Sequence, residues 1–284
     1  MQLSRRLLFG SAVWEVTRPR TPLTSGHLMI RLSNPATALD HRSAADWLRC
    51  HNAARRALAD VLGADTCTLL FAHRWHALGA AIGEPAAESS TPTFHLFGRW
   101  DGEPVTPAGQ LSLPAQRRKP APDRELDKYD AGLRAALLTA AAAAVDEAPD
   151  ATVDGTPDRT GPEADAKTVA EGDQEEAARE QDAPLPAIRA WTPPFPAGSD
   201  HTVLAPERPI GSVEEVTPRE LLALAAALEA LSLRQAVTGL SCLVPDTAVT
   251  GGRLELHALG RSAGEAVNPF EMLLQSPEIS HALL

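Results

Sequence analysis

Two stretches of the chain carry a histidine and an arginine at the same spacing, and these side chains are candidates for chemistry. The stretches are Thr93–Arg99 and Glu255–Arg261, each an apolar run with one central histidine and a Gly-Arg ending. A guanidinium binds a phosphate through two parallel hydrogen bonds, and an imidazole donates or accepts a proton near neutral pH. The two arginines, Arg99 and Arg261, are therefore candidate phosphate clamps.

The same side chains also have ordinary structural explanations. A single histidine on an apolar strand, such as His95 or His257, is more often a hydrogen-bonded core residue than a catalyst, and an arginine after a strand is usually solvated. His73 and His76 have a spacing that could bind a metal, but no clear third ligand lies nearby in the sequence. The sequence accordingly predicts no metal and no cofactor.

Each histidine strand is preceded by another strand that also contains a histidine. His27 lies 68 residues before His95, and His201 lies 56 residues before His257. Two strand-histidine pairs at similar separation suggest one fold used twice. We expect His27 and His201 themselves to be structural residues.

The hydrophobic pattern predicts the same order of elements in each half: hairpin, helix, strand, loop and strand. In the first half, Ser43 and Asp46 form a capping pair that opens the helix, and Gly63 ends it. In the second half, Thr217 caps the equivalent helix. The predicted strands cover residues 11–16, 26–32, 66–72, 93–100, 201–205, 240–244 and 253–259, and further helices begin near Asp123 and Asn268.

Acidic charge is concentrated in one segment. Of the net charge of -11, the segment from Val145 to Ala183 contributes -10, from thirteen acidic and three basic residues. This segment has few large apolar side chains, so it cannot bury enough surface to offset its conformational entropy, and we expect a disordered linker. The remainder is near neutral and gives no support for nucleic acid as a partner.

Composition and cysteine content favour a reduced protein outside the membrane. The 284 residues are 44% hydrophobic, which is enough for a core. Three widely spaced cysteines, an odd number, are typical of a reducing compartment. No apolar run reaches the ~18 residues of a transmembrane helix. We therefore expect a cytoplasmic protein with no membrane partner.

Several of these stretches resemble the histidine-triad superfamily. The strand at His27 and the later His95 stretch carry the resemblance in the first half. In the second half it rests on His201–Arg208, followed by Ser212–Glu220 and a leucine-rich helix, because the family commonly has such a strand before a Thr-Pro-Glu-type helix start. Two such halves in one chain are similar to the galactose-phosphate uridylyltransferase branch, whose members carry a duplicated fold.

The resemblance implies an α+β protein made of two histidine-triad-like halves. Each half is expected to be an antiparallel sheet with a hairpin, one long helix and the patterned strand. We expect the first half at residues 1–122, a connecting helix at 123–147, the acidic disordered linker at 148–183 and the second half at 184–284.

The resemblance also implies nucleotide binding, with the α-phosphate held against the patterned strand. On this basis the predicted phosphate-binding residues are His95, Arg99, His257 and Arg261. The family's nucleophile is the middle histidine of His-x-His-x-His or His-Pro-His, and its imidazole attacks phosphorus to form a covalent intermediate.

This sequence departs from the family at the nucleophile position. If His95 is the last histidine of the pattern, the earlier two positions hold Thr91 and Thr93. If His257 is the last, they hold Arg253 and Glu255. Neither a threonine nor an arginine can act as the nucleophile, and a glutamate would repel a phosphate.

Three functions remain open from the sequence. The missing middle histidine favours a degenerate protein that binds a nucleotide or nucleotide sugar and is weakly active or inactive. The alternatives are an active nucleotidyltransferase or hydrolase that uses a displaced histidine, and a protein-interaction scaffold. A scaffold would dock through the acidic linker and through the basic cluster at Arg117–Lys119.

The linker gives a testable prediction. Limited proteolysis of the full chain should cut first between residues 145 and 183, because that segment lacks a buried core, and the two fragments should remain associated. Slow amide exchange across the segment, measured by mass spectrometry, would contradict this expectation.

Overall fold

The computed structural model describes residues 7–74, 92–146, 183–234, 237–246, 253–262, 269–275 and 279. Within these ranges nine strands form one sheet in the order β1-β2-β3-β5-β4-β8-β9-β7-β6. The strands are β1 (Leu7–Gly10), β2 (Trp14–Thr17), β3 (His27–Leu32), β4 (Thr66–His73), β5 (Thr93–Arg99), β6 (Ile188–Trp191), β7 (His201–Pro206), β8 (Gly239–Asp246) and β9 (Leu256–Arg261). All of their pairings are antiparallel.

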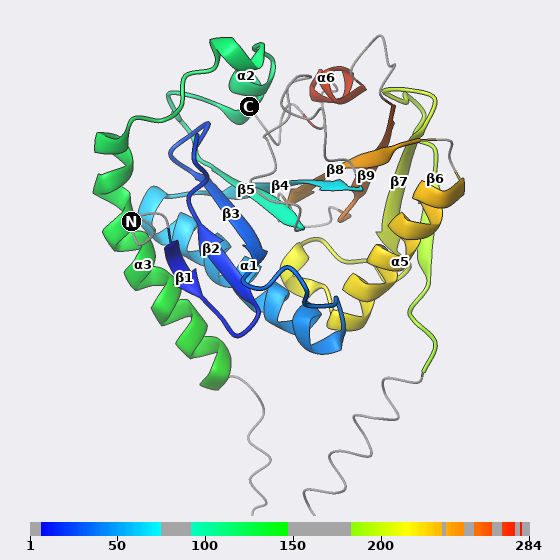
Figure 1. Cartoon of the computed structure of the whole chain (residues 1–284), viewed down its shortest axis with the longest axis horizontal. Helices are drawn as coiled ribbons and strands as arrows, with labels where there is room; N and C mark the ends of the chain where they lie inside the picture. Colours follow the sequence, from blue (N-terminus) through cyan, green and yellow to red (C-terminus); the bar gives the residue numbers. More distant parts are fainter. Residues whose placement is uncertain are drawn as a thin grey trace, which may run out of the picture.

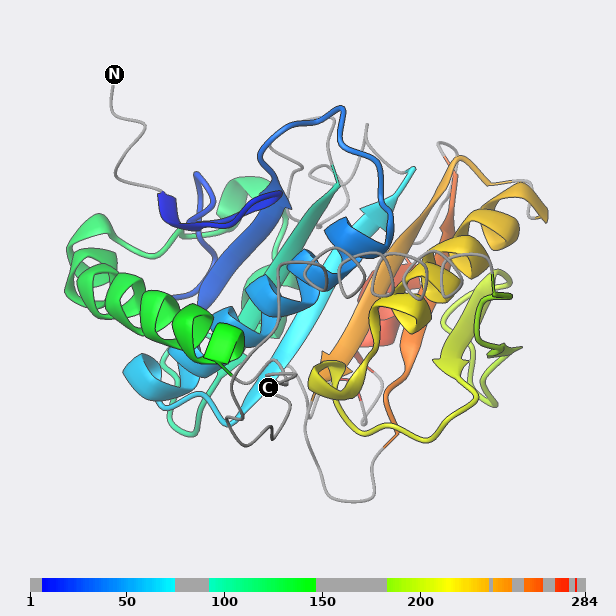
Figure 2. The same cartoon turned by 90° about the horizontal axis from the view of Figure 1, so that it is seen from below.

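The helices form two layers on opposite faces of this sheet (Figure 1). The helices are α1 (His41–Leu62), α2 (Pro107–Leu111), α3 (Asp123–Asp146), α5 (Pro218–Arg234) and α6 (Pro269–Leu274), with short 3-10 turns η2 (Ala115–Arg117) and η3 (Val213–Glu215). Helices α1, α3 and α5 lie across one face, as Figure 2 shows from below, and α2 and α6 lie over the other. We call the face covered by α1, α3 and α5 the helix face. We call the other the histidine face, because His95 and His257 lie on it.

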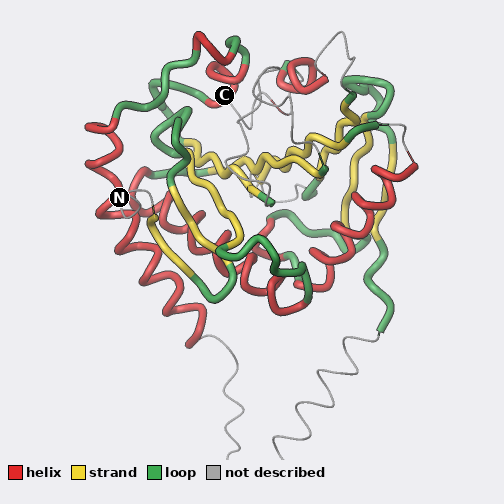
Figure 3. The backbone as a smooth tube through the Cα atoms, in the orientation of Figure 1, coloured by secondary structure: helices red, strands yellow, loops and turns green. Residues whose placement is uncertain are grey.

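The sheet is curved around the helix face. Figure 3 shows the central strands as a band between the two helix layers, while the outer strands on each side descend past α1 and α5. The larger cluster of buried apolar side chains lies in this concave space and includes Leu58, Leu133, Leu228 and Leu240. A smaller cluster, which includes Phe97 and Phe270, fills the histidine face.

The strand order reads alike on both sides of the central pair, β4 and β8. Going outward, one side has β5, β3 and β2, and the other has β9, β7 and β6. Helix α1 connects β3 to β4, and α5 connects β7 to β8. The predicted strands and helices are therefore present, whereas β1, β6 and α2 were not predicted from the sequence.

The predicted cap of α1 is wrong by one turn. The N-cap is Asp40, whose carboxylate accepts a hydrogen bond from the Ser43 amide at 2.8 Å, while the Ser43 hydroxyl accepts one from the Asp40 amide. This reciprocal pair is a capping box with the acidic residue first. Asp46 has a different role, because its carboxylate accepts hydrogen bonds from the Ser11 hydroxyl and the Val13 amide.

Ion pairs fasten each central strand to the helix of the other half. At the end of β8, buried Asp246 lies 3.6 Å from the Arg55 guanidinium on α1, and Arg55 also pairs with Glu214 at 3.0 Å. At the end of β4, Arg74 forms an ion pair with Glu229 on α5, and the His73 imidazole lies 3.1 Å from the same carboxylate. These contacts, together with the β4–β8 ladder, hold the two halves in one body.

Some sequence expectations fall outside the described residues. These are the acidic linker between residues 147 and 182, the loop with His76 and Thr91, and the start of the last helix at Asn268. None of the described helices combines the length and apolar character needed to cross a membrane.

The close packing around Gly260 on β9 gives a stability prediction. A Cβ added at Gly260 would lie 2.5 Å from Asp200 Cβ and 2.9 Å from a Val237 methyl. Because the neighbours must shift, Gly260→Ala should lower the free energy of unfolding by about 1–3 kcal/mol, as overpacked cores do. Gly10→Ala is the control, since nothing lies within 4 Å of its added Cβ. Urea denaturation that gives equal stabilities for both variants would contradict the close approach.

Candidate active site

Adjacent strands place the histidines of each half on the same face of the sheet. On β3 and β5, His27 is paired with Phe97 and Met29 with His95, so the two histidines are diagonal neighbours. On β7 and β9, His201 is paired with Leu259 and Val203 with His257, which is the same arrangement. Residues two apart on a strand share a face, so each histidine strand presents His-x-Phe-x-Arg or His-x-Leu-x-Arg to the histidine face.

The two histidines of each half are hydrogen-bonded to one another. His27 Nε2 lies 3.0 Å from His95 Nδ1, and His201 Nε2 lies 3.0 Å from His257 Nδ1. A backbone amide begins each chain of bonds: Leu23 N–H donates to His27 Nδ1, and Ala197 N–H donates to His201 Nδ1, both at 3.1 Å. We call each chain of bonds a histidine relay.

The amide at the start of each relay fixes the tautomer of both imidazoles. An amide can only donate, so His27 Nδ1 carries no proton, and the proton of the neutral ring lies on Nε2. That Nε2–H donates to His95 Nδ1, which leaves the His95 proton on its own Nε2. The same reasoning assigns Nε2–H to His257. Each relay therefore ends in a hydrogen-bond donor, and not in the lone pair that a nucleophile needs.

Burial keeps the relay imidazoles neutral. Loss of solvation lowers the pKa of His27 well below its ordinary value and lowers the pKa of His95 to about 4. The pKa values of His201 and His257 are also lowered to about 4, first by burial and for His257 also by its histidine neighbour. A ring stacked on His27, that of Phe97 at 4.1 Å between centroids, contributes to this apolar setting. The relays are thus uncharged at neutral pH.

The arginines at the strand ends are buried, which corrects the expectation that such residues are solvated. Arg99 forms a 2.5 Å ion pair with Glu103, and both side chains are almost fully buried. Burial raises the pKa of the Glu103 carboxyl. Arg261 is completely buried, and its guanidinium donates to the Ser241 hydroxyl at 2.8 Å. Both arginines are therefore engaged inside the protein, and direct phosphate contact by either remains a proposal.

The structure keeps the two relays apart. Strands β4 and β8 lie between β5 and β9, and three interstrand spacings of 4.7–4.9 Å separate the histidine strands by roughly 14 Å. His95 and His257 are therefore parts of two separate sites. They are not equally accessible, since His257 is partly exposed whereas His95 is buried.

The residues two positions before His95 and His257 differ between the halves. Thr93 is buried on the histidine face, two residues before His95 on β5. Glu255 precedes β9, and its carboxylate lies 3.8 Å from His257 Nε2. The relays were not predicted from the sequence, because we expected His27 and His201 to be structural residues only. Their matching position at the start of each upstream strand was the available signal.

Two other sequence candidates have structural partners. His73 lies on the helix face, 3.1 Å from the Glu229 carboxylate. Within the described ranges, no group of three residues could hold a metal ion. In the basic cluster Arg117–Lys119, the Arg118 guanidinium donates to the backbone carbonyls of Gln110 and Leu113 near the end of α2. This residue therefore stabilises its own loop.

A cavity of about 380 Å³ lies on the helix face, between α5, α1 and the central strands. Its lining is almost entirely apolar and comprises Trp14, Leu39, Trp47, Leu69, Phe71, Ala72, Pro92, Phe94, Leu204, Pro206, Val213, Val216, Leu221, Leu224, Ala225, Leu228, Val244, Leu254 and Leu256, with His73 and Arg74 at one end. This site was not predicted from the sequence.

Comparisons with known proteins found only weak similarity, and that only to solved structures. No protein-family model matches the sequence, and the search of curated proteins found no match. The chain is similar to a Hit-like protein involved in cell-cycle regulation from Bartonella henselae, with 16% identity, a TM-score of 0.32, and 46% of this chain and 85% of that chain covered. It is also similar to a zinc-bound histidine triad family protein from Mycobacterium smegmatis, with 19% identity, a TM-score of 0.31, and coverage of 48% and 86%.

The relays predict a pH dependence of stability. In the unfolded chain each histidine has its ordinary pKa near 6.5, whereas His95, His201 and His257 have a pKa of about 4 in the folded protein. The unfolded state therefore binds more protons between these values, and the free energy of unfolding should fall as the pH falls from about 6.5 to about 4. Urea denaturation at a series of pH values measures this.

His257→Gln provides the matched variant for the pH series. A glutamine amide oxygen can still accept the hydrogen bond from His201 Nε2, but it does not titrate in this range. The variant should lose less stability than the wild type between pH 6.5 and 4. An unchanged slope in the variant would show that His257 is not one of the titrating groups.

Proposed function

We propose that this chain is an internally duplicated histidine-triad-like protein that binds a nucleotide or nucleotide sugar and forms no covalent intermediate. The observation that carries the proposal is the pair of histidine relays. Each ends in an Nε2–H donor, which can bind a phosphate oxygen but cannot attack phosphorus.

Duplication is supported by the matching contacts of the two halves. The amide-to-histidine distance is 3.1 Å in both, the histidine-to-histidine distance is 3.0 Å in both, and the ring centroids lie 5.2 and 5.3 Å apart. The next crossing matches as well, because Gly98 N–H donates to Gly26 O and Gly260 N–H donates to Asp200 O, both at 3.0 Å. The uridylyltransferase-like branch is proposed on this arrangement and on the sequence resemblance.

The absence of covalent chemistry is supported by the cost of the alternative tautomer. For His257 Nε2 to become a nucleophile, the proton would have to move to Nδ1, where it would meet the proton on His201 Nε2. The hydrogen bond between the buried rings would then be lost, leaving two buried donors facing each other, which costs about 1–3 kcal/mol for each unsatisfied group. A threonine hydroxyl is a poor nucleophile near neutral pH, so Thr93 does not replace the missing imidazole.

The second half is the better candidate for binding. His257 is more exposed than His95, so its Nε2–H can reach a ligand oxygen. Arg261 lies two residues beyond Leu259 on the same face, and its buried positive charge favours an anion without needing direct contact. The Glu255 carboxylate lies 3.8 Å from His257 Nε2, so its negative charge would repel an anion bound there and limit the affinity. Arg99 and His95 would form the weaker equivalent in the first half.

Slow hydrolysis is a second candidate function. Glu255 is partly exposed, with 38% of its side chain accessible, and lies beside the His257 donor. A carboxylate in that position could act as general base toward a water molecule while His257 Nε2–H holds the phosphate oxygen. This reaction needs no histidine nucleophile.

A nucleotide panel screened by thermal shift tests the binding proposal, because a ligand of the native state raises the melting temperature. Glu255→Gln should strengthen phosphate binding by a few-fold, since it removes a negative charge beside the donor. Glu207→Gln is the control, because it makes the same charge change at an exposed turn after β7. Equal affinities in both variants would contradict a phosphate site at His257.

Intact mass spectrometry tests the chemistry. After incubation with nucleotide sugars or adenosine phosphates, the wild type should carry no covalent nucleotide. A nucleotide adduct that disappears in His95→Ala or His257→Ala would restore the transferase alternative. Slow release of product that is lost in Glu255→Gln, without an adduct, would favour hydrolysis.

A further inference from the structure

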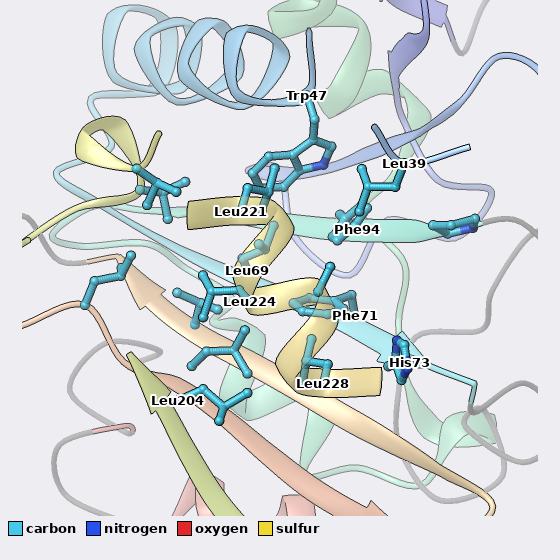
Figure 4. Close-up of a pocket in the computed structure, with 18 of the residues that line it drawn as sticks. Leu39, Trp47, Leu69, Phe71, His73, Phe94, Leu204, Leu221, Leu224 and Leu228 are labelled. Atoms are coloured by element: carbon cyan, nitrogen blue, oxygen red, sulfur yellow. The ribbon is translucent and has the colours of Figure 1, made fainter. Parts of the chain in front are cut away.

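The cavity on the helix face has the form of a small-molecule site. One wall is α5, which contributes Leu221, Leu224 and Leu228, and Trp47 of α1 projects toward them over Leu69 and Phe71 of the sheet (Figure 4). Its volume of about 380 Å³ falls in the range of ligand pockets. The aliphatic lining suits an extended hydrocarbon chain and offers too few polar groups for a nucleotide.

The exposed end of the cavity is charged. The lining residues there include His73 and Arg74, and the side chain of Arg74 is 49% exposed. Glu229 on α5 accepts from both His73 and Arg74. An exposed ion pair of this kind contributes little to stability, so a second carboxylate can share or replace Glu229 on Arg74 at small cost.

The backbone of Arg74 and the indole of Trp47 are two further features of this cavity. Arg74 has φ of 58°, and it is the single non-glycine residue with positive φ in the described ranges. Strained backbone of this kind concentrates at ligand clamps. The indole Nε1 of Trp47 is buried and has no hydrogen-bond partner in the described structure. The polar groups bordering the cavity are thus mainly donors, which favours a ligand with an acceptor oxygen.

We propose that this cavity binds a free aliphatic carboxylic acid of the fatty-acid class, with its chain among the leucines and its carboxylate at Arg74. The proposal goes beyond the nucleotide function and uses no residue of the histidine relays. It can therefore hold or fail independently of that function.

Tryptophan fluorescence provides a direct test, because Trp14 and Trp47 both line the cavity. The full chain is titrated with ω-bromodecanoate, whose bromine quenches a tryptophan only at close range. We expect saturable quenching that unlabelled decanoate reverses. Quenching that is absent, or that does not saturate, would overturn the proposal. A cavity filled by another part of the chain would give no quenching, so that case also counts against it.

Two neighbouring alanines on α5 localise the binding. Ala225 lines the cavity, whereas Ala226 is exposed on the same helix. Ala225→Phe should weaken decanoate binding by at least tenfold by occupying the cavity, and Ala226→Phe should leave it unchanged. Circular dichroism and melting temperature confirm that each variant is folded. Equal binding by both variants would place the ligand elsewhere and overturn the assignment.

The head group is tested with Arg74. Decanoate should bind the wild type about tenfold more tightly than methyl decanoate does, in line with a charge-assisted hydrogen bond. Arg74→Gln should remove this preference and still bind the ester, which shows that the cavity is intact, and Arg74→Lys should restore part of it. Equal affinity of acid and ester for the wild type would overturn the carboxylate assignment.

Discussion

The antiparallel pairing of β4 with β8 is the interaction on which the rest of the structure depends. It runs from Cys67 opposite Asp246 to His73 opposite Leu240 and makes one sheet from strands of both halves. The ion pairs at its two ends, Asp246 with Arg55 and Arg74 with Glu229, bind each central strand to the opposite helix. Because of this pairing, both relays face the same side, and the cavity forms beneath the central strands.

The histidine relays show how burial and hydrogen bonds together set the charge and the tautomer of an imidazole. Burial removes the solvation of the charged form, so the neutral imidazole is favoured. A backbone amide then donates to Nδ1 of the inner histidine, which places the proton of that ring on Nε2. Because this Nε2–H donates to Nδ1 of the outer histidine, the proton of the outer ring also lies on Nε2. The same solution occurs in both halves, although the ring that covers His27 is Phe97 in one half and the equivalent position is Leu259 in the other.

The two faces of the sheet are suited to different ligands. The histidine face carries polar groups that are paired internally and largely covered by α2, α6 and the smaller apolar cluster. The helix face carries an unfilled apolar volume with a charged rim. A hydrocarbon needs an apolar space, which the cavity of the helix face provides, and the donors at its rim suit a single acidic head group.

The sequence by itself determined the main strands, the long helices and the repeated histidine pattern, because alternation, helical periodicity and end signals such as Gly63 act over a few residues. It did not determine β1 and β6, since short outer strands exist only through pairing with a neighbour. It could not decide that Arg99 and Arg261 are buried, because Glu103 and Ser241 reach them through loop folding and strand pairing. The tautomers of His95 and His257 depend on contacts 68 and 56 residues away. Those contacts, and the cavity between two helices from different halves, are properties of the tertiary structure alone.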